Sequence, residues 1–374
     1  MNILGTNIIS SLGFTTDENF AAVKRGVSGV KHYDVGTFDL PEAFMASLID
    51  KEKLNDEFCK NATHCISAEL TDLEKASILS IHLANKEAQL DLASEKTIFI
   101  LSTTKGNVDK LDENSENRTF LWHTANLIRD FFDNKNTPII VCNACISGAA
   151  AQLSAMRVLQ SEKYDNAVVV GVDFLSKFIV SGFQSFKALA PELCKPFDKE
   201  RVGLNLGEAA ATMIFSRVEK GNGAVLLNGA IRNDATHISA PSRTGEGSYR
   251  ALKYILQGVD IDDISFISAH GTATPYNDAM EVNAIVRAGL QNVPVHLLKA
   301  NFGHTLGAAG VLESIISLRT LEEDLVLKTM NFEEQEFENQ MRISTENTVS
   351  DKKYCVKMMS GFGGVNAALL FRKS

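Results

Sequence analysis

The 374-residue chain contains only 7 prolines and no low-complexity run, which argues against long disordered linkers. No stretch approaches 18 uninterrupted apolar residues, so we expect no membrane-spanning helix. The first residues carry no basic region followed by an apolar run, and we therefore expect no secretory signal. Basic residues are outnumbered, 37 against 46 acidic ones, whereas a nucleic-acid-binding protein would carry a basic stripe. These absences predict a cytoplasmic globular protein that binds neither membrane nor nucleic acid.

The six cysteines lack the spacing of a disulfide framework, and a chain of this length can bury a core without one. Cys142 and Cys145 form a single C-x-x-C pair, a pattern found in redox and zinc sites. Zinc sites usually need a second Cys or His pair close by, so we expect reduced thiols and no bound metal.

Short apolar runs alternate with helical patterns along the whole chain, which predicts the α/β class. Strands buried on both faces are expected at 97–101, 138–142, 167–172 and 209–215, and a second set at 223–228, 264–268, 295–298, 354–359 and 367–371. Helices are expected at 146–161 and 308–322. The two sets predict two halves, residues 1–217 and 218–374, without a direct sequence repeat between them.

The segment around Cys145 runs from a predicted strand through small residues into a predicted helix. Free backbone N–H groups and the helix dipole at such a position favour a thiolate and can face an oxyanion. Cys145 is therefore a candidate nucleophile that should react with iodoacetamide faster than the other thiols, and a small residue at a tight turn is the alternative. Cys142, on the strand itself, is expected in the core.

Two histidines follow predicted strands. His270 opens a Gly/Thr/Pro loop after the strand 264–268, at the kind of strand end where α/β proteins gather their sites. His304 lies in a Gly/Ala-rich segment between Lys299 and Glu313, two residues that could form a charge network around it. Each could instead be an ordinary loop histidine or surface charge.

A glycine-rich turn, residues 360–366, joins the last two predicted strands and contains Phe362. Taken in this order, the four segments resemble those of the 3-oxoacyl-(acyl carrier protein) synthases I and II and their polyketide ketosynthase relatives. The resemblance covers nearly the whole chain and includes residues 195–198, 207–209 and 234–241. It implies a duplicated thiolase-like fold with five layers, αβαβα, in which residues 1–217 carry the nucleophile and residues 218–374 carry both histidines.

The resemblance also implies the chemistry, a decarboxylative condensation of an acyl thioester with malonyl carrier protein in fatty-acid or accessory polyene or polyketide synthesis. Cys145 would be acylated, and His270 and His304 would hold the malonyl thioester carbonyl. Lys299 and Glu313 would form the supporting ion pair, and the N–H groups of Cys145 and Phe362 the oxyanion hole, with Phe362 also gating the acyl pocket. Thr272 and Thr274 would contact the phosphopantetheine arm, and no cofactor or metal would be needed.

The implied partners are an acyl carrier protein and a second copy of the chain, with a heterodimer containing a ketosynthase-like subunit as a further possibility. Ser360 replaces the Phe of many relatives and Val202 replaces an Asp, and both differences point toward an accessory pathway. Three alternatives remain open at this point: a chain-length-factor-like partner subunit, a decarboxylase or thioesterase on the same scaffold, and a metal-binding protein that uses the Cys and His residues.

Overall fold

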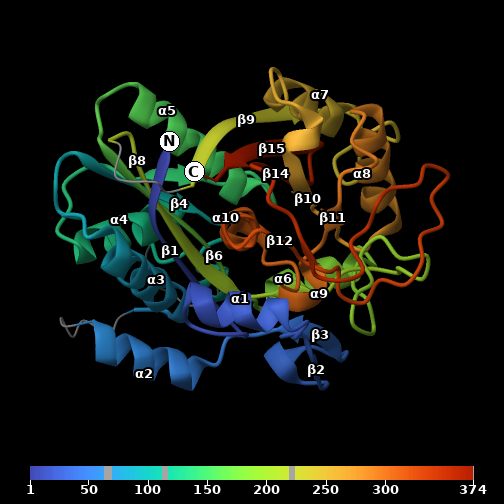
Figure 1. Cartoon of the computed structure of the whole chain (residues 1–374). Helices are drawn as coiled ribbons and strands as arrows, with labels where there is room; N and C mark the ends of the chain where they lie inside the picture. The colour runs from blue at the N-terminus through green and yellow to red at the C-terminus, as the bar shows by residue number, and fades with distance from the viewer. Residues whose placement is uncertain (63–69, 112–116, 219–223, 374) are drawn as a thin grey trace.

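The computed structural model describes residues 1–62, 70–111, 117–218 and 224–373, and Cys65 lies outside these ranges. Figure 1 labels the elements. The strands are β1 (Asn2–Ser10), β2 (Lys31–Tyr33), β3 (Phe44–Ser47), β4 (Thr97–Ser102), β5 (Ile139–Val141), β6 (Asn166–Asp173), β7 (Leu206–Gly207), β8 (Ala209–Ser216), β9 (Val225–Asn233), β10 (Ile264–Ser268), β11 (Val295–His296), β12 (Leu325–Val326), β13 (Thr348–Val349), β14 (Tyr354–Gly361) and β15 (Val365–Arg372). The α-helices are α1 (Thr16–Lys24), α2 (Lys51–Asn61), α3 (Asp72–Ala88), α4 (Leu121–Phe131), α5 (Ser147–Gln160), α6 (Lys177–Ser185), α7 (Glu246–Ile255), α8 (Pro275–Arg287), α9 (Lys299–Phe302) and α10 (Ala309–Glu322).

Each predicted strand and helix is present, with small differences at the ends. The strand predicted at 295–298 stops at His296, because Lys299 already begins the short helix α9. The strand predicted at 138–142 is not buried on both faces, since β5 is the edge of the sheet and its residues are only half-buried.

Within the described residues, ten strands form one sheet in the order β11-β10-β14-β15-β9-β1-β8-β6-β4-β5. Counted outward from the centre, β1-β8-β6-β4-β5 and β9-β15-β14-β10-β11 have the same pattern, two antiparallel pairings followed by two parallel ones. Among the described residues, the two half-sheets are paired at Asn2 and Val225, with backbone hydrogen bonds from Ile3 to Ala224 and from Leu226 to Met1 on either side. The topology therefore repeats even though the sequence does not.

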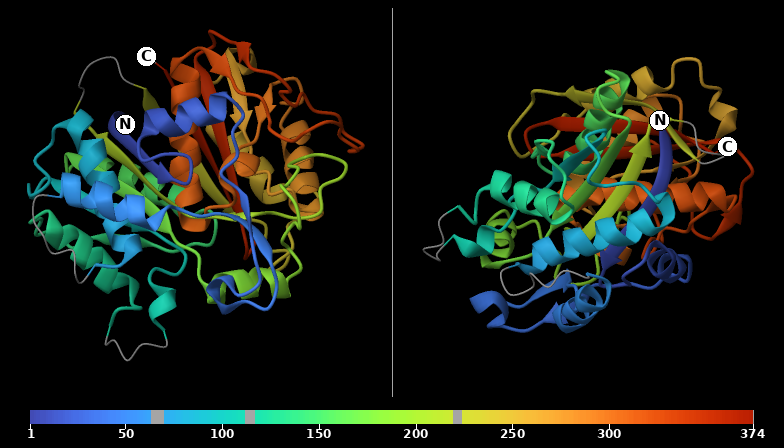
Figure 2. Two further views of the ribbon diagram at one scale, coloured as in Figure 1. Left: turned by 90° about the horizontal axis from the view of Figure 1, so that it is seen from below. Right: turned by 90° about the vertical axis from the view of Figure 1, so that its left-hand side faces the viewer.

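Helices α5 and α10 pack against each other and against strands of both half-sheets. Figure 1 shows α10 near the middle of the molecule, and the two further views in Figure 2 place it between the half-sheets. Helix α3 covers the outer face of one half-sheet, and α7 covers that of the other. This is the predicted five-layered α/β arrangement. The boundary at residue 217 itself stays a prediction, because β8 ends at Ser216, β9 begins at Val225, and 219–223 lie outside the described residues.

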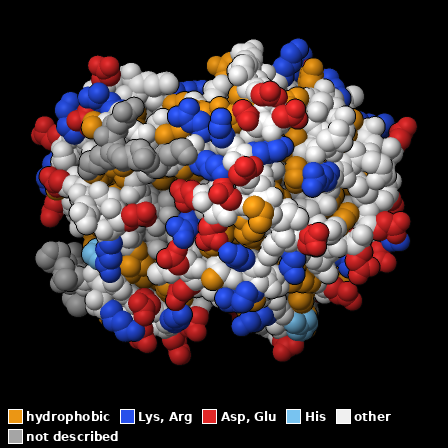
Figure 3. All heavy atoms as spheres, in the orientation of Figure 1, with side chains coloured by type: hydrophobic (Ala, Val, Ile, Leu, Met, Phe, Trp, Pro, Cys, Tyr) orange, Lys and Arg blue, Asp and Glu red, His pale blue; other side chains and the backbone are white. Residues whose placement is uncertain are grey.

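Acidic and basic side chains are interspersed over the face shown in Figure 3. Within the ranges that the structure describes, no helix combines the length and the apolar character needed to cross a membrane.

Candidate active site

Cys145 lies in a sharp turn between β5 and α5. Ala144 adopts a left-handed backbone conformation, with φ of 45°, which a non-glycine residue rarely takes and which surrounding contacts must hold. Ser147 supplies such contacts: its hydroxyl donates to the Ala144 carbonyl at 2.6 Å and accepts from the Asn143 N–H at 2.8 Å. The strand, turn and helix together present the Cys145 sulfur at the end of the half-sheet, as predicted.

The two central helices approach each other unusually closely beside this turn. A side chain on Gly310 would come within 2.4 Å of the Ala149 nitrogen, and one on Gly148 within 2.7 Å of the Val311 nitrogen. Gln152 spans the contact and donates to the Gly310 carbonyl at 2.9 Å. Glycine at both positions therefore lets α10, which follows His304, lie against α5, which follows Cys145.

His270 follows β10, at the edge where the strand ends. Its backbone N–H and that of Gly271 both donate to the buried carboxylate of Glu281 on α8, at 2.7 Å each. The His270 carbonyl accepts from Lys299 Nζ at 3.0 Å. Charged groups thus fix the backbone of this histidine from both sides.

His304 comes from the second half of the chain but is held by the first half. Its N–H donates to the Asn205 carbonyl at 2.7 Å, and its carbonyl accepts from the Gly207 N–H at 3.0 Å. Gly303, with φ of 68°, approaches the Leu206 carbonyl so closely that a side chain there would lie 2.3 Å from its oxygen. The glycine is therefore required for His304 to reach β7.

The structure brings the three predicted side chains together. The Cys145 sulfur and one ring nitrogen each of His270 and His304 lie within 4.8 Å of one another. The two imidazole rings meet edge to face, with centroids 5.1 Å apart and an interplanar angle of 82°. Cys142, the fourth ligand of the proposed metal site, is not part of this cluster within the described residues.

Hydrogen bonds to the Nδ1 atoms indicate which ring nitrogens carry protons. Lys299 Nζ lies 3.4 Å from His270 Nδ1, and the Leu306 N–H donates to His304 Nδ1 at 3.4 Å. An Nδ1 atom that accepts leaves the proton of a neutral imidazole on Nε2. His304 Nε2 is buried without a partner among the described residues, so it is a free donor. Burial, followed by the charge of Lys299, lowers the pKa of both histidines well below 6.5 and keeps them neutral.

The expected thiolate at Cys145 is wrong for the resting site. Burial raises the pKa of its thiol to about 11, although Lys299, Lys105 and the backbone N–H of Phe362 all favour the anion. Desolvation outweighs these contributions because the side chain is only 9% exposed. The sulfur therefore rests as a thiol.

Lys299 and Glu313 form the predicted ion pair, fully buried behind the histidines. Glu313 also pairs with Lys357 of β14, whose Nζ lies 2.5 Å from the second carboxylate oxygen. Although burial alone would raise the pKa of Glu313, Lys299 and Lys357 hold it below its usual value. Sequence reasoning missed Lys357, because a lysine within a predicted strand gives no signal of a buried partner.

Two further buried acids also escaped the sequence analysis. Glu281 holds the backbone of His270, as described above. Asp173, at the end of β6, accepts from the Gly307 N–H at 2.7 Å and from the Thr103 hydroxyl at 2.8 Å. It thereby fixes the turn that follows His304.

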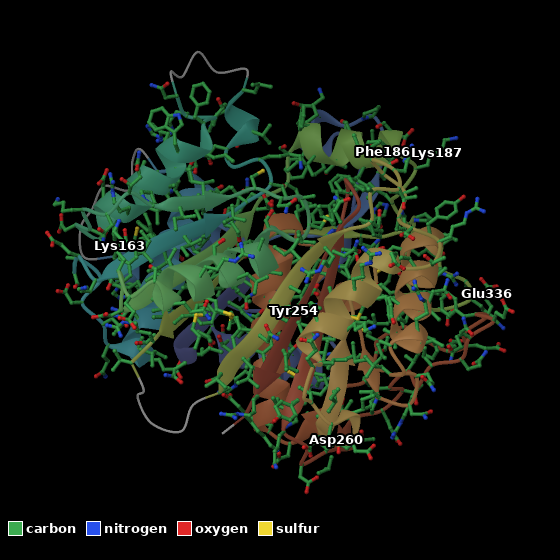
Figure 4. The ribbon with its side chains drawn as sticks, turned by 90° about the horizontal axis from the view of Figure 1, so that it is seen from above. Lys163, Phe186, Lys187, Tyr254, Asp260 and Glu336 are labelled. Atoms are coloured by element: carbon green, nitrogen blue, oxygen red, sulfur yellow. The ribbon has the colours of Figure 1, made fainter. Side chains whose placement is uncertain are left out.

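Phe362 lies in the turn between β14 and β15, and its backbone N–H favours the anionic form of the Cys145 sulfur. Its ring is 42% exposed and contacts the rings of Phe183 and Phe186, with centroids 6.2 and 5.7 Å away. Figure 4 shows Phe186 and Lys187 next to each other at the end of α6, on the outside of the molecule.

A cavity of about 460 Å³ opens above the three reactive side chains. Thr272 and Thr274 line the cavity, with their hydroxyl oxygens 2.8 Å apart. Val202 and Ser360, the two residues that differ from those of many relatives, also line it. Mostly apolar walls with a few polar groups suit an extended thioester.

Cys142 was expected in the core, and this is wrong. The residue follows the end of β5 and is exposed, with its Sγ 3.3 Å from the Thr104 carbonyl. Its exposure follows from the position of β5 at the sheet edge, which the sequence pattern does not reveal.

Two family models match consecutive parts of the chain: the beta-ketoacyl synthase N-terminal domain over residues 73–221 and the C-terminal domain over residues 223–333. The chain belongs to the beta-ketoacyl synthase family. It is thereby a member of a family of condensing acyltransferases. The N-terminal model covers Cys145 and the C-terminal model covers both histidines, which is the order that the resemblance implied.

Curated relatives agree with this assignment. The chain is 26% identical to a 3-oxoacyl-[acyl-carrier-protein] synthase 2 from Vibrio cholerae, over 99% of this chain and 98% of that protein. It is 31% identical to the protein of the same name from Rhizobium meliloti, over 62% of this chain and 60% of that one.

Solved structures show the same fold. A beta-ketoacyl synthase from Burkholderia phymatum superposes with a TM-score of 0.86 at 24% identity, covering 100% of this chain and 99% of that one. The ishigamide ketosynthase/chain length factor gives a TM-score of 0.88 at 24% identity, covering 100% and 98%.

Proposed function

We propose that this chain is a 3-oxoacyl-(acyl carrier protein) synthase that condenses an acyl group on Cys145 with malonyl carrier protein. The observation that carries this proposal is the meeting of one thiol and two imidazoles within 4.8 Å at the floor of a cavity. A thiol that rests protonated suits thioester exchange, because its proton passes on to the thiolate of the departing carrier.

In the first step the Cys145 sulfur attacks the acyl thioester carbonyl, and the phosphopantetheine thiol leaves with the proton. The Phe362 N–H, which favours negative charge at the sulfur, would be a donor for the oxyanion that forms next to it. We propose the backbone N–H of Cys145 as the second donor to this oxyanion.

In the second step malonyl carrier protein binds in the same cavity and loses carbon dioxide. The electron pair of the broken C–C bond becomes an enolate, and its oxygen accepts from the Nε2–H groups of His270 and His304. The enolate carbon then attacks the Cys145 thioester, the sulfur leaves as a thiolate that takes up a proton from solvent, and the 3-oxoacyl product remains on the carrier. Neutral histidines are required here, which matches their lowered pKa.

Variants that separate the two steps test this function. Purified protein is incubated with a panel of acyl carrier proteins and with malonyl carrier protein, and intact mass reports the acyl groups that load. We expect Cys145→Ala to abolish loading, and the matched variant Cys142→Ala, whose thiol lies outside the cluster, to load normally.

His304→Ala should still load but should release carbon dioxide roughly 100- to 1,000-fold more slowly, since one enolate donor is lost. Wild-type protein that neither loads nor decarboxylates would contradict the enzyme proposal and favour a chain-length-factor-like subunit. Loading and decarboxylation without a 3-oxo product would favour a decarboxylase.

The partner proposals are an acyl carrier protein and a second copy of the chain. Lys187 provides a cation beside exposed Phe186 at the cavity mouth, where the acidic carrier would deliver its arm. The edge strand β5 leaves backbone groups available for pairing with another sheet. Light scattering of the purified chain, alone and with a ketosynthase-like subunit, distinguishes a homodimer from a heterodimer.

A further inference from the structure

Lys357 is an unusual residue for its position. It lies in the middle of β14, a central strand, and its side chain is fully buried. Lysine is almost never buried in this way unless it is paired. Burial lowers the pKa of its ammonium group, although Glu313 opposes that effect.

Within the described part of the chain, the contacts of the Lys357 ammonium group lead toward the catalytic histidines. It pairs with Glu313 at 2.5 Å, and it donates to the carbonyls of Ser268 and Ala269 at 3.2 and 3.0 Å. Those two carbonyls form the end of β10, directly before His270. Lys299 donates to the other carboxylate oxygen of Glu313. It also donates to the His270 carbonyl, which is the next carbonyl along the chain.

The two lysines therefore clamp one carboxylate and three successive carbonyls. The charge of Lys357 also contributes to the lowered pKa of both His270 and His304. The titratable and charged groups around it are Glu313, Lys299, Glu281, His270, His304 and His296.

We propose that Lys357 is a positioning residue of the condensation site: it fixes the strand end that carries His270 and, together with Lys299, holds the Glu313 carboxylate in place behind the histidines. The proposal rests on the function proposed above, and it assigns Lys357 to the decarboxylation step only. The charged groups that influence the Cys145 thiol are other ones, Lys299, Lys105 and Asp173.

The test compares Lys357→Met, Lys357→Gln and Lys357→Arg with wild type from pH 5.5 to 8.5. Loading onto Cys145 and carbon dioxide release from malonyl carrier protein are measured separately. In the Met and Gln variants the strand end before His270 loses its bonds to the ammonium group. Their decarboxylation should therefore fall roughly 100-fold relative to wild type, the usual cost of a displaced catalytic group. Loading should change little.

Lys357→Arg keeps the charge and should keep the wild-type pH profile. This variant remains informative if the Met and Gln variants fold poorly. Lys373→Met is the matched control, because it removes a lysine of another ion pair, with Asp324, directly after the neighbouring strand β15. Equal losses of loading and decarboxylation at every pH, or an Arg variant that loses as much decarboxylation as the Met variant, would overturn the proposal. Wild-type protein without decarboxylation would instead refute the proposed function, and ¹⁵N spectra of His270 would then still report whether Lys357→Met displaces it.

Discussion

At the scale of single residues, burial governs the chemistry of this site more than formal charge does. Two lysines and a backbone N–H favour the thiolate form of Cys145, and yet burial raises the pKa of its thiol to about 11. The same desolvation lowers the pKa of His270 and His304 and leaves them neutral. A neutral thiol beside two neutral donors is an arrangement for thioester exchange followed by enolate stabilisation.

This protonation state predicts how Cys145 reacts with iodoacetamide. Because only the thiolate is alkylated, the labelling rate in the folded protein should rise about tenfold for each pH unit from 7 to 10. Peptide mass spectrometry of Cys145 after timed labelling measures this, with urea-unfolded protein as the control. A rate that is already maximal at pH 8 would show that the thiol is activated in the resting enzyme.

At the scale of elements, the site depends on how closely α5 and α10 approach. Gly148 and Gly310 face each other where a methyl group would collide with backbone. Cys145 precedes one helix and His304 precedes the other, so the helix separation sets the distance between the sulfur and the imidazole.

Gly310→Ala should therefore reduce condensation and lower the free energy of unfolding by about 1–3 kcal/mol, the usual range for overpacking. Gly182→Ala in α6 is the control, since nothing lies within 4 Å of the added methyl group. It should be neutral or stabilising by about 0.5–1 kcal/mol. Urea unfolding compares the two variants, and equal stabilities would contradict the role of the close contact.

The elements also show what sequence patterns reveal. The strand before Cys145, the strand before His270 and the small residues around His304 are local features, and each was predicted correctly. Lys357 was missed because its burial depends on Glu313, which is remote in the chain. The burial of Cys142 was predicted wrongly, since no local pattern tells an edge strand from a central one.

At the scale of the whole molecule, several buried titratable groups link stability to pH in opposite directions. Burial raises the pKa of Asp278 and of Glu208 to about 7, so their contribution to stability declines as the pH rises toward 7. Burial and then Lys357 lower the pKa of His296 to about 3, so its contribution is complete above about pH 6.5 and is lost as the pH falls.

His296 offers a clear test of this linkage, because both its ring nitrogens lack hydrogen-bond partners among the described residues. His296→Leu should be about as stable as wild type at pH 7.5. At pH 5 it should be more stable by about 2 kcal/mol, the cost of keeping an imidazole of ordinary pKa unprotonated. Urea unfolding at both pH values measures the difference, and an unchanged difference would mean that His296 is not held neutral.

The half-sheets are paired at Asn2 and Val225, whereas the reactive groups are divided between them. The thiol belongs to one half, both imidazoles to the other, and β7 of the thiol half holds His304 in place. Neither half alone holds the thiol and both imidazoles, so separated fragments should be inert until they reassociate.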